Sequence, residues 1–526
     1  MYSAILAPAG SFWHRRSGTL WVTSRDWLGP PPCNATAPMS CGPTPTPAVY
    51  ERHVPEDTAL YQVVQEHWET FRARVEEAGE SLPKHVVAEV EGFLRCGVLV
   101  HGFVRLYCDA CKGCRVLAFS CKGRGLCPSC AGRFMADTAA HIVDKVIRPI
   151  PVRQWVLTLP FAIRRWAACR PEVISALNTI LVQTVFAWLR SRARDLGIED
   201  GEPGAITFIQ RFADGVKLMP HLHVVVSDGV FTRVTAGPAR FHAVRAPSQT
   251  ELEQLVAKVA AKAEKALAKL DRHSNDVPAF TDRCAGVAVQ AELSLDDTRR
   301  PRKLRGPKPE RKLPRLCAEV DGFNLHAAVR IAARSRKALE HLIRYVARPA
   351  IADGRLSLGD DGRVHVELKR VWADGTRSVS YDPLTFLERV VALIPPPRVN
   401  LVRYAGVWGA HSALRKHVLP SPPPDPPVAR LTARAEDCVA SRRLRMSWAE
   451  LLKRVFGVDG LACSRCTKRL RVIGVVYEPT AVEGILAALS LPVTEPPRAR
   501  ARAPPSEDAF DDSNGDPLPS WYGEAA

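Results

Sequence analysis

Two histidines in the segment 204–229 have the spacing of metal ligands. His221 and His223 are separated by one residue, and side chains alternate across a β-strand, so both imidazoles point to the same face. Neutral imidazole binds several divalent cations. The pair therefore predicts a site for one divalent cation. Two hydrogen-bonded histidines on a half-buried strand would give the same pattern, and this remains the alternative.

A third ligand is expected on the preceding strand. Asp214-Gly215 is typical of a tight turn with a two-residue loop, which places Phe208 opposite His221. Gln210 then lies on the histidine face, one diagonal step from His221. Because Gln210 is a polar residue on an otherwise apolar face, it needs a partner, and a metal would supply one. Gln210 is the predicted third ligand, and Asp214 is the alternative.

A tyrosine on an amphipathic helix is the candidate nucleophile. The helix is predicted over 336–348, because four apolar residues recur at helical spacing: Leu339, Leu342, Ile343 and Val346. Tyr345 lies at the edge of this stripe, so its ring can rest on the core while its hydroxyl faces a cleft. A tyrosine can attack a phosphate covalently if a bound cation polarises that phosphate. The alternative is an ordinary tyrosine at the core boundary.

Basic residues near the tyrosine fit a phosphate substrate. Arg344 and Arg348 line the neighbouring polar face of the helix and are predicted to hold flanking DNA phosphates. Lys369, expected on a nearby strand, is a candidate to neutralise the phosphate, and a solvated lysine is the default interpretation. His341, one turn before Tyr345, orients Tyr345, accepts its proton or is simply solvated. Tyr404 is a rival nucleophile, for which core packing is the favoured interpretation.

The cysteines indicate a structural zinc. Cys108 and Cys111 form one pair with two intervening residues, and Cys127 and Cys130 form another. This paired spacing predicts one tetrahedral zinc site, and four thiolates leave no open position for catalysis. Four further residues compete for the site or complete it: Cys96, His101, Cys114 and Cys121.

Three smaller features accompany these cysteine pairs. Lys122 and Arg124 stand in the cysteine-rich block and are predicted to contact the DNA backbone. Cys463 and Cys466 form a lone half-site, which finds partners within the fold, finds them across a dimer, or binds nothing. Ser447 and Glu450 precede this half-site with the pattern of a helix capping box.

The composition fits two alternatives, a protein that binds nucleic acid and a merely basic, soluble protein, and a cytoplasmic location is expected for either. The 526 residues carry a net charge of +18 with a pI of about 9.5, which concentrates the protein near polyanions. No export signal is apparent at the N-terminus. The apolar stretch 173–189 contains several polar residues and is predicted to be a buried helix instead of a membrane span.

The chain divides into six predicted segments. A flexible extension over 1–50 precedes a helical and zinc-binding domain over 51–147. A domain that contains the histidine pair and the tyrosine helix spans 148–395 and includes a basic loop at 298–316. A connecting segment with a Pro-rich linker covers 396–428, a small module with the lone cysteine pair covers 429–490, and a disordered tail covers 491–526.

Taken together, these segments resemble the HUH-type rolling-circle transposases of the IS91 and ISCR-like family, over roughly residues 55–490. The motifs that carry the resemblance are CKGRGLCPSC (121–130), VRQWVLTLPF (152–161), FIQRFADGVKLMPHLHVVVSDGVF (208–231), HLIRYVARP (341–349), RYAGVWGAH (403–411) and WAELLKRVFGVDGLACSRC (448–466). Some members carry two tyrosines four residues apart on the helix. This chain has His341 at the earlier position, so it resembles a single-tyrosine branch.

The resemblance implies an α+β fold, in which an HUH endonuclease-type antiparallel sheet with flanking helices follows a zinc-binding domain. It implies His221 and His223 as ligands of Mg²⁺ or Mn²⁺, Zn²⁺ as a structural ion, and Tyr345 as the nucleophile. The expected substrate is single-stranded DNA at the ends of a mobile element and its target, cut through a 5′-phosphotyrosine intermediate. A second subunit is an open alternative, and no membrane partner is expected.

Two other functions remain open at this stage. A rolling-circle replication initiator or relaxase would use the same chemistry for a different biological task. A non-catalytic zinc-containing DNA-binding regulator, derived from a transposase, would share the charge and the cysteines. The regulator would have no use for a meeting of His221, His223 and Tyr345, so their positions in space distinguish it.

Overall fold

A large antiparallel sheet forms the centre of the computed structural model, which describes residues 50, 52–235, 237–271, 279–289, 313–372, 375–420 and 446–502. Within these residues, six strands follow the order β14-β4-β5-β3-β9-β8, and β10 also pairs with β3. Their bounds are β3 Val152–Thr158, β4 Gly204–Ala213, β5 Lys217–Ser227, β8 Cys317–Val320, β9 Phe323–His326, β10 Arg330–Ile331 and β14 Val402–Gly406. All the pairs are antiparallel. The predicted mixture of helices and antiparallel sheet is confirmed.

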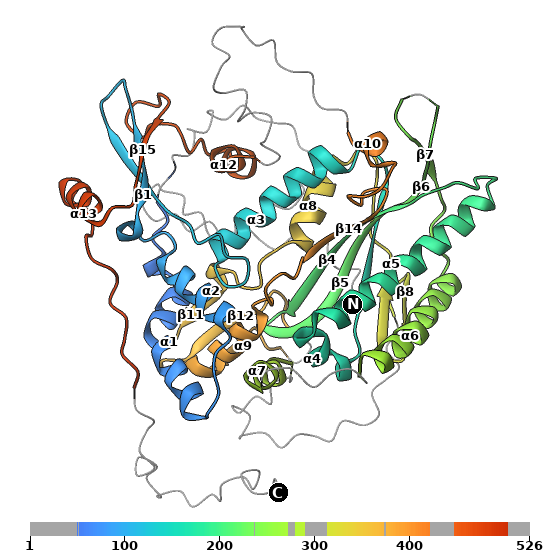
Figure 1. The fold of residues 1–526 in the computed structure, drawn as a ribbon, viewed down its shortest axis with the longest axis horizontal. Coiled ribbons are helices and arrows are strands. Elements are labelled where there is room, and N and C mark those ends of the chain that lie inside the picture. Colours follow the sequence, from blue (N-terminus) through green and yellow to red (C-terminus); the bar gives the residue numbers. More distant parts are fainter. Residues whose placement is uncertain are drawn as a thin grey trace, which may run out of the picture.

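Helices cover both faces of this sheet (Figure 1). On one face lie α4 (Phe161–Cys169), α5 (Pro171–Arg194) and α6 (Gln249–Asp271), which pack on Leu222, Val224 and Val226 of β5. On the other face, α3 (Pro128–His141) and α8 (Arg336–Val346) pack on Ile206 and Phe208 of β4. The strand alternation thus separates two apolar cores. The face that carries α8 is the face that carries the histidines.

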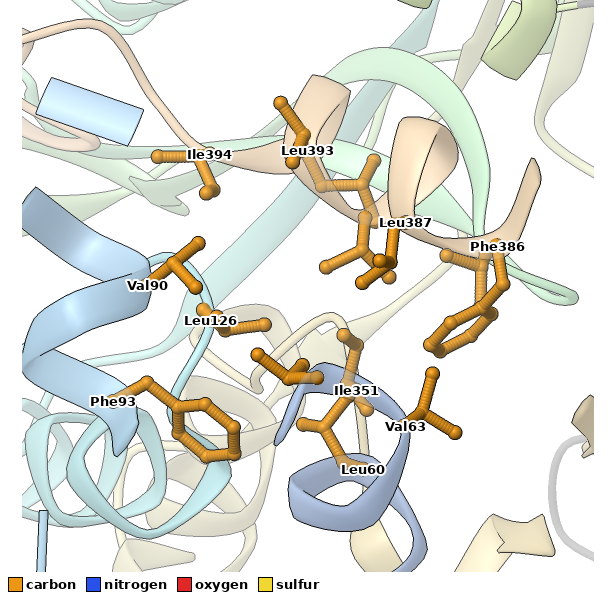
Figure 2. Close-up of a cluster of buried hydrophobic side chains, with 14 of the residues drawn as sticks. Leu60, Val63, Val90, Phe93, Leu126, Ile351, Phe386, Leu387, Leu393 and Ile394 are labelled. Atoms are coloured by element: carbon orange, nitrogen blue, oxygen red, sulfur yellow. The ribbon is translucent and has the colours of Figure 1, made fainter. Parts of the chain in front are cut away.

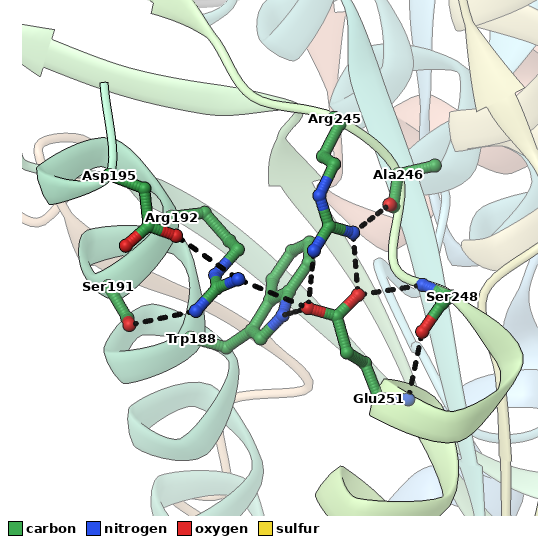
Figure 3. Close-up of polar contacts among 8 residues, drawn as sticks. All are labelled: Trp188, Ser191, Arg192, Asp195, Arg245, Ala246, Ser248 and Glu251. Carbon is green, nitrogen blue, oxygen red and sulfur yellow. Dashed lines mark hydrogen bonds and ion pairs between the residues drawn. The ribbon is translucent and has the colours of Figure 1, made fainter.

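Polar contacts fasten the start of α6 to α5 (Figure 3). Glu251 accepts hydrogen bonds from Arg245 Nη1 at 2.6 Å and Nη2 at 2.8 Å, and from Trp188 Nε1 at 3.3 Å. The backbone N–H of Ser248 donates to the same carboxylate at 2.8 Å. Arg245 lowers the pKa of Glu251 to about 2. Glu251 therefore acts as a charged cap at the start of α6 and ties this helix to α5.

Helix α5 is long and apolar enough to cross a membrane by length and composition. Half of its most apolar window is buried within the protein. Its buried side chains, among them Val173, Leu177, Leu181 and Val185, lie in the core between the sheet and α6. This packing is that of a core helix.

A third core joins segments that are far apart in the sequence (Figure 2). Leu60 and Val63 come from α1 (Ala59–Glu77), Phe93 comes from α2 (Lys84–Arg95), and Phe386 and Leu387 come from α9 (Pro383–Leu393). The small sheet of β11 (Leu356–Leu358), β12 (Val364–Glu367) and β13 (Ser378–Tyr381) contributes to the same core. The last part of the predicted nuclease domain, 351–394, thus packs with the N-terminal helices.

The C-terminal segment completes the N-terminal domain. Strand β15 (Arg471–Val476) pairs with β1 (Phe103–Tyr107), which pairs with β2 (Cys114–Ala118). Helix α13 (Pro479–Ala488) packs on the short helix η3 (Leu99–His101). Beyond it, Arg502 pairs with Glu66 of α1 at 2.6 Å. A separate module over 429–490 and a disordered tail from 491 were therefore wrong for the described residues, because the open edge of β1 binds this segment.

Other elements are shorter. They are η2 (Pro55–Asp57), η4 (Ile142–Val146), β6 (Gly229–Thr232), β7 (Arg240–Ala243), α7 (Ala279–Val289), η5 (Asp353–Arg355), α10 (Arg415–Val418) and α12 (Trp448–Phe456). The predicted N-terminal extension, most of the basic loop 298–316, most of the Pro-rich linker and the tail from 503 lie outside the described residues.

Candidate active site

The register of the β4–β5 hairpin differs from the prediction by two residues. Gln210 lies directly opposite His221, and Phe208 lies opposite His223. The expected pairing of Phe208 with His221 was wrong for two reasons. The loop contains three residues, 214–216, with Val216 at a φ of 56°, and the register shifts again between Gln210 and Phe212 of β4, where β5 has one extra residue between Leu218 and His221. The change brings Gln210 closer to the histidines than predicted.

The two histidines converge on one point. His221 Nε2 and His223 Nε2 are 3.0 Å apart, and both side chains are buried. Two ligand atoms about 2.1 Å from one octahedral cation, at a right angle, are separated by about 3.0 Å. The spacing therefore fits a shared cation as well as it fits a hydrogen bond.

The protonation of the pair suits metal binding. His221 Nδ1 is 2.7 Å from the carbonyl oxygen of Met219, so this nitrogen carries the proton and Nε2 keeps its lone pair. Burial lowers the pKa of His221 to about 4, and burial followed by the proximity of His221 holds the pKa of His223 well below its usual value. Both imidazoles are thus neutral at neutral pH, which is the form that binds metals.

Gln210 has one satisfied end and one free end. Its Nε2 donates to the carbonyl oxygens of Val346 at 2.7 Å and Tyr345 at 3.3 Å, at the end of α8. Two carbonyl acceptors identify this atom as the nitrogen. The other atom, Oε1, is buried and has no hydrogen-bond partner among the described residues. A buried unpaired amide oxygen is an unfavourable arrangement that a cation would relieve.

Asp214, the alternative third ligand, is engaged elsewhere. Its carboxylate accepts from Arg355 Nη2 at 2.7 Å and from the backbone N–H of Lys369 at 2.6 Å. In the described part of the chain, the groups of three or more His, Cys, Asp or Glu ligand atoms that could hold a metal consist of cysteines alone. A third His or carboxylate ligand therefore does not accompany His221 and His223 there.

Helix α8 brings Tyr345 to the histidines. The predicted apolar stripe of α8 is buried, and the helix ends at Val346, two residues earlier than expected. The ring centroids of Tyr345 and His223 are 6.2 Å apart and nearly perpendicular. Two cations flank the phenol: Arg348 Cζ lies 4.5 Å and Lys369 Nζ 4.6 Å from its ring centroid. Burial raises the pKa of Tyr345, but these cations outweigh it, and the net pKa lies below the ordinary value.

The remaining predicted residues occupy different positions. Arg344 is half-buried, and its Nε and Nη2 have no hydrogen-bond partner among the described residues. Lys369 lies two residues beyond β12 and not on a strand as expected. His341 is exposed on α8. Tyr404 packs in the apolar cluster on the α8 face of the sheet, in agreement with the core interpretation.

Gln154 was missed from the sequence. It lies on β3, and its side-chain amide is 2.7 Å from His223 Nδ1. Turning this amide would let His223 Nδ1 donate to the glutamine oxygen, which frees Nε2 for a cation. The available signal was the one that identified Gln210: Gln154 is a polar residue between Val152 and Val156 on the same face of a buried strand.

The cysteines form two clusters instead of one. Cys127 and Cys130 join Cys96 and Cys121, with sulfur contacts of 3.5–3.6 Å. A tetrahedron of sulfurs 2.3 Å from a zinc ion has edges of about 3.8 Å, whereas a disulfide needs about 2.05 Å. The cluster fits zinc. Lys122 and Arg124 are exposed on its loop.

The predicted partnership of Cys108 and Cys111 with Cys127 and Cys130 was therefore wrong. Cys108 and Cys111 lie instead with Cys463 and Cys466 in a second cluster. Sequence spacing favoured Cys127 and Cys130, the pair nearest in the chain. The pairing of β1 with β15 instead brings Cys463 and Cys466 beside Cys108 and Cys111.

Two family comparisons describe the same regions. A family model described as "Putative transposase" matches residues 204–415, which contain both histidines and the tyrosine. A model described as a transposase zinc-binding domain, of the IS91 type, matches residues 63–159, which contain the first cysteine cluster. No curated protein and no solved structure matches the chain. The zinc-domain match and the sulfur geometry together support the predicted structural Zn²⁺.

Proposed function

Because the chain belongs to the IS91-family transposases, which act on DNA, we propose that it cuts and rejoins single-stranded DNA through a covalent bond to Tyr345. In this proposal the central sheet is an HUH-type nuclease core, which strand β14 (Val402–Gly406) completes from beyond the predicted boundary at residue 395. A rolling-circle transposition reaction, with a 5′-phosphotyrosine intermediate, follows from this chemistry.

One observation carries the proposal. Tyr345 reaches the imidazole of His223 from a helix more than a hundred residues downstream, with the ring centroids 6.2 Å apart. Because a phosphate must contact both a cation and the attacking phenol, the two groups must lie within a few ångström of one substrate atom. A protein that only bound DNA would have no need for this proximity. The non-catalytic alternative is therefore disfavoured.

The residues present fit a divalent cation. His221 Nε2, His223 Nε2 and Gln210 Oε1 would hold it, since the first two atoms converge and the third lacks a hydrogen-bond partner among the described residues. Mg²⁺ or Mn²⁺ bound there would act as a Lewis acid on the scissile phosphate. Gln154 would orient His223 through Nδ1.

The chain's own residues then account for the strand cut. The phenol of Tyr345 loses its proton, its oxygen bonds to phosphorus, and the bond from phosphorus to the 3′ oxygen breaks. The departing 3′ oxygen takes up a proton, and the 5′ phosphate stays on Tyr345. Arg348 and Lys369, whose positive charges flank the phenol, favour the phenolate and the charge on the phosphate. Arg344, with two buried donors that lack a partner in the described structure, would bind an adjacent phosphate.

Rejoining is the reverse reaction with a different strand. A 3′ hydroxyl attacks the phosphotyrosine, the phenol leaves, and no nucleotide cofactor is consumed. His341 stands where a second tyrosine would be needed for a direct exchange between two nucleophiles. In this chain, Tyr345 is therefore used again, or a second subunit supplies another tyrosine.

A covalent adduct tests the proposal. The protein is incubated with Mg²⁺ and single-stranded DNA that carries the element's end and a label on the 3′ side of the cut. Denaturing gel electrophoresis should show labelled protein for the parent chain and none for Tyr345→Phe, because the phenylalanine ring lacks the attacking oxygen. His223→Ala should also lose the adduct.

The matched control is Tyr404→Phe. Tyr404 lies in the apolar cluster on the same face of the sheet, so this variant should form the adduct as the parent does. If Tyr345→Phe forms as much adduct as the parent and Tyr404→Phe forms none, then Tyr404 on β14 is the nucleophile.

A further inference from the structure

The second cysteine cluster joins two segments that are distant in the sequence. Cys108 and Cys111 stand in the turn between β1 and β2, and Cys463 and Cys466 precede β15. Cys108 Sγ is 3.4 Å from Cys466 Sγ, and Cys111 Sγ is 3.5 Å from Cys463 Sγ. These separations exceed a disulfide bond and are close to the edge of a zinc-centred sulfur tetrahedron. The zinc-domain match ends at residue 159, so it does not include the second pair.

The two cysteine turns have the same backbone structure. The N–H of Cys108 donates to the carbonyl of Gly113 at 2.9 Å, and the N–H of Cys463 donates to the carbonyl of Lys468 at 2.8 Å. In each turn the residue after the second cysteine is left-handed: Lys112 has a φ of 58° and Thr467 a φ of 59°.

This shared conformation has an energetic cost. A left-handed conformation costs a non-glycine residue about 1–2 kcal/mol. Such strain persists where the surroundings impose it, and metal sites are among the places where it occurs. The two turns share this strained conformation, and each contributes two cysteine sulfurs. Together they form the two halves of one tetrahedral site.

Few apolar side chains are buried around the cluster itself. The buried core there consists of Leu106 and Leu470 with Cys108 and Cys463. On β15, Val472 is 59% and Val475 57% exposed. Small domains with so little buried apolar surface usually need a metal or disulfides for stability. A bound ion would supply what this core lacks.

The same segment contacts the tyrosine helix. Helix α12 ends at Phe456, shortly before Cys463, and its Leu451 packs on Met135 and Ala136 of α3. Arg454 of α12 donates to Glu340 of α8 from Nε at 3.1 Å and from Nη2 at 2.7 Å.

Arg454 also pairs with Asp144, which follows α3. Its side chain is 23% exposed, so the ion pairs are partly shielded from water. Both carboxylates raise the pKa of Arg454, against the effect of its burial. Arg454 therefore links the C-terminal segment to the helix that carries Tyr345.

We propose that Cys108, Cys111, Cys463 and Cys466 bind a second structural zinc ion, and that this zinc fastens the C-terminal segment so that α12 braces helix α8. The site is distinct from the cluster of Cys96, Cys121, Cys127 and Cys130. The proposal concerns metal content and the mobility of α8, so it does not depend on Tyr345 being the nucleophile.

Metal content tests the first half. The parent chain, purified without chelator, should contain two zinc ions per chain by plasma mass spectrometry. The double variant Cys463→Ser/Cys466→Ser should contain one. Cys114→Ser is the matched control and should retain two, because Cys114 stands in the same region but belongs to neither cluster. Two zinc ions in the double variant, or one in the parent, would overturn the proposal.

Cobalt binding gives a readout that does not depend on the folding of a variant. The parent chain, stripped of metal, is titrated with Co²⁺ while the thiolate-to-cobalt absorption is followed. Two four-thiolate sites predict saturation at two equivalents with a tetrahedral spectrum. Saturation at one equivalent contradicts the second site.

Hydrogen exchange tests the second half. Amides of α8, residues 336–346, should exchange at least about fivefold faster in the double cysteine variant than in the parent, since their brace is released. Arg454→Ala should also accelerate exchange in α8 while keeping both zinc ions. Amides of β3 serve as an internal reference and should not change. Parental exchange in α8 of the double cysteine variant would show that the zinc site does not brace this helix.

Discussion

At the residue scale, the side chain of Gln210 has two roles. Its amide nitrogen holds the last carbonyls of the tyrosine helix, and its buried oxygen faces no hydrogen-bond donor among the described residues. If this oxygen is a ligand, Gln210→Ala should weaken Mn²⁺ binding by at least about tenfold, because one protein ligand of three is removed. Isothermal titration calorimetry of the parent and the variant with Mn²⁺ measures the difference.

Asp214→Asn is the control for this measurement. Asp214 binds Arg355 and the backbone of Lys369 and is not placed as a ligand, so Mn²⁺ affinity should stay within about twofold of the parent value. If Asp214→Asn binds Mn²⁺ weakly and Gln210→Ala binds it as the parent does, then Asp214 is the third ligand and Gln210 is not.

The sequence predicted the positions of single residues well where the periodicity of a strand or helix determines on which face a side chain lies. Strand alternation placed His221 and His223 on one face, and helical periodicity placed Tyr345 at the edge of an apolar stripe. It was less informative where two segments meet. Gln154 becomes significant only once β3 lies beside β5, and the partners of Cys108 depend on a strand that begins at Arg471.

At the scale of elements, a buried ion pair joins β3, β5 and β10. Asp228, 5% exposed, accepts from Arg153 Nε at 2.9 Å and from Arg330 Nε at 2.6 Å. Asp228→Ala would leave the buried Arg153 without its countercharge, so it should lower the free energy of unfolding by about 3–5 kcal/mol.

Urea denaturation followed by far-ultraviolet circular dichroism checks this expectation. Asp200→Ala, at an exposed position, should change the free energy of unfolding by no more than about 0.5 kcal/mol. Equal stabilities of the two variants would mean that the ion pair is not needed to hold these strands.

The long elements were predicted closely from their periodicity. The apolar stretch 173–189, predicted to be a buried helix, lies within α5 (Pro171–Arg194), and the helix predicted over 336–348 is α8 (Arg336–Val346). The register of the β4–β5 hairpin was not predicted correctly. The extra loop residue and the bulge both depend on local backbone strain, which the alternation of apolar residues does not encode.

At the scale of the whole molecule, the two ends of the chain build one region. Residues 446–502 add β15 to the N-terminal sheet, place α12 on α3 and run along α1. Long-range pairings of this kind leave no periodic signal, so the sequence suggested independent modules. In the structure, α3 of the zinc-binding region and α12 of the C-terminal segment both contact α8, the helix that positions Tyr345.

The most direct test identifies the residue that carries the DNA. The adduct formed with single-stranded DNA and Mg²⁺ is digested with nuclease and trypsin, and the modified peptide is sequenced by tandem mass spectrometry. The account predicts a nucleotide attached through its 5′ phosphate to Tyr345. A nucleotide on Tyr404 or on any other residue would contradict it.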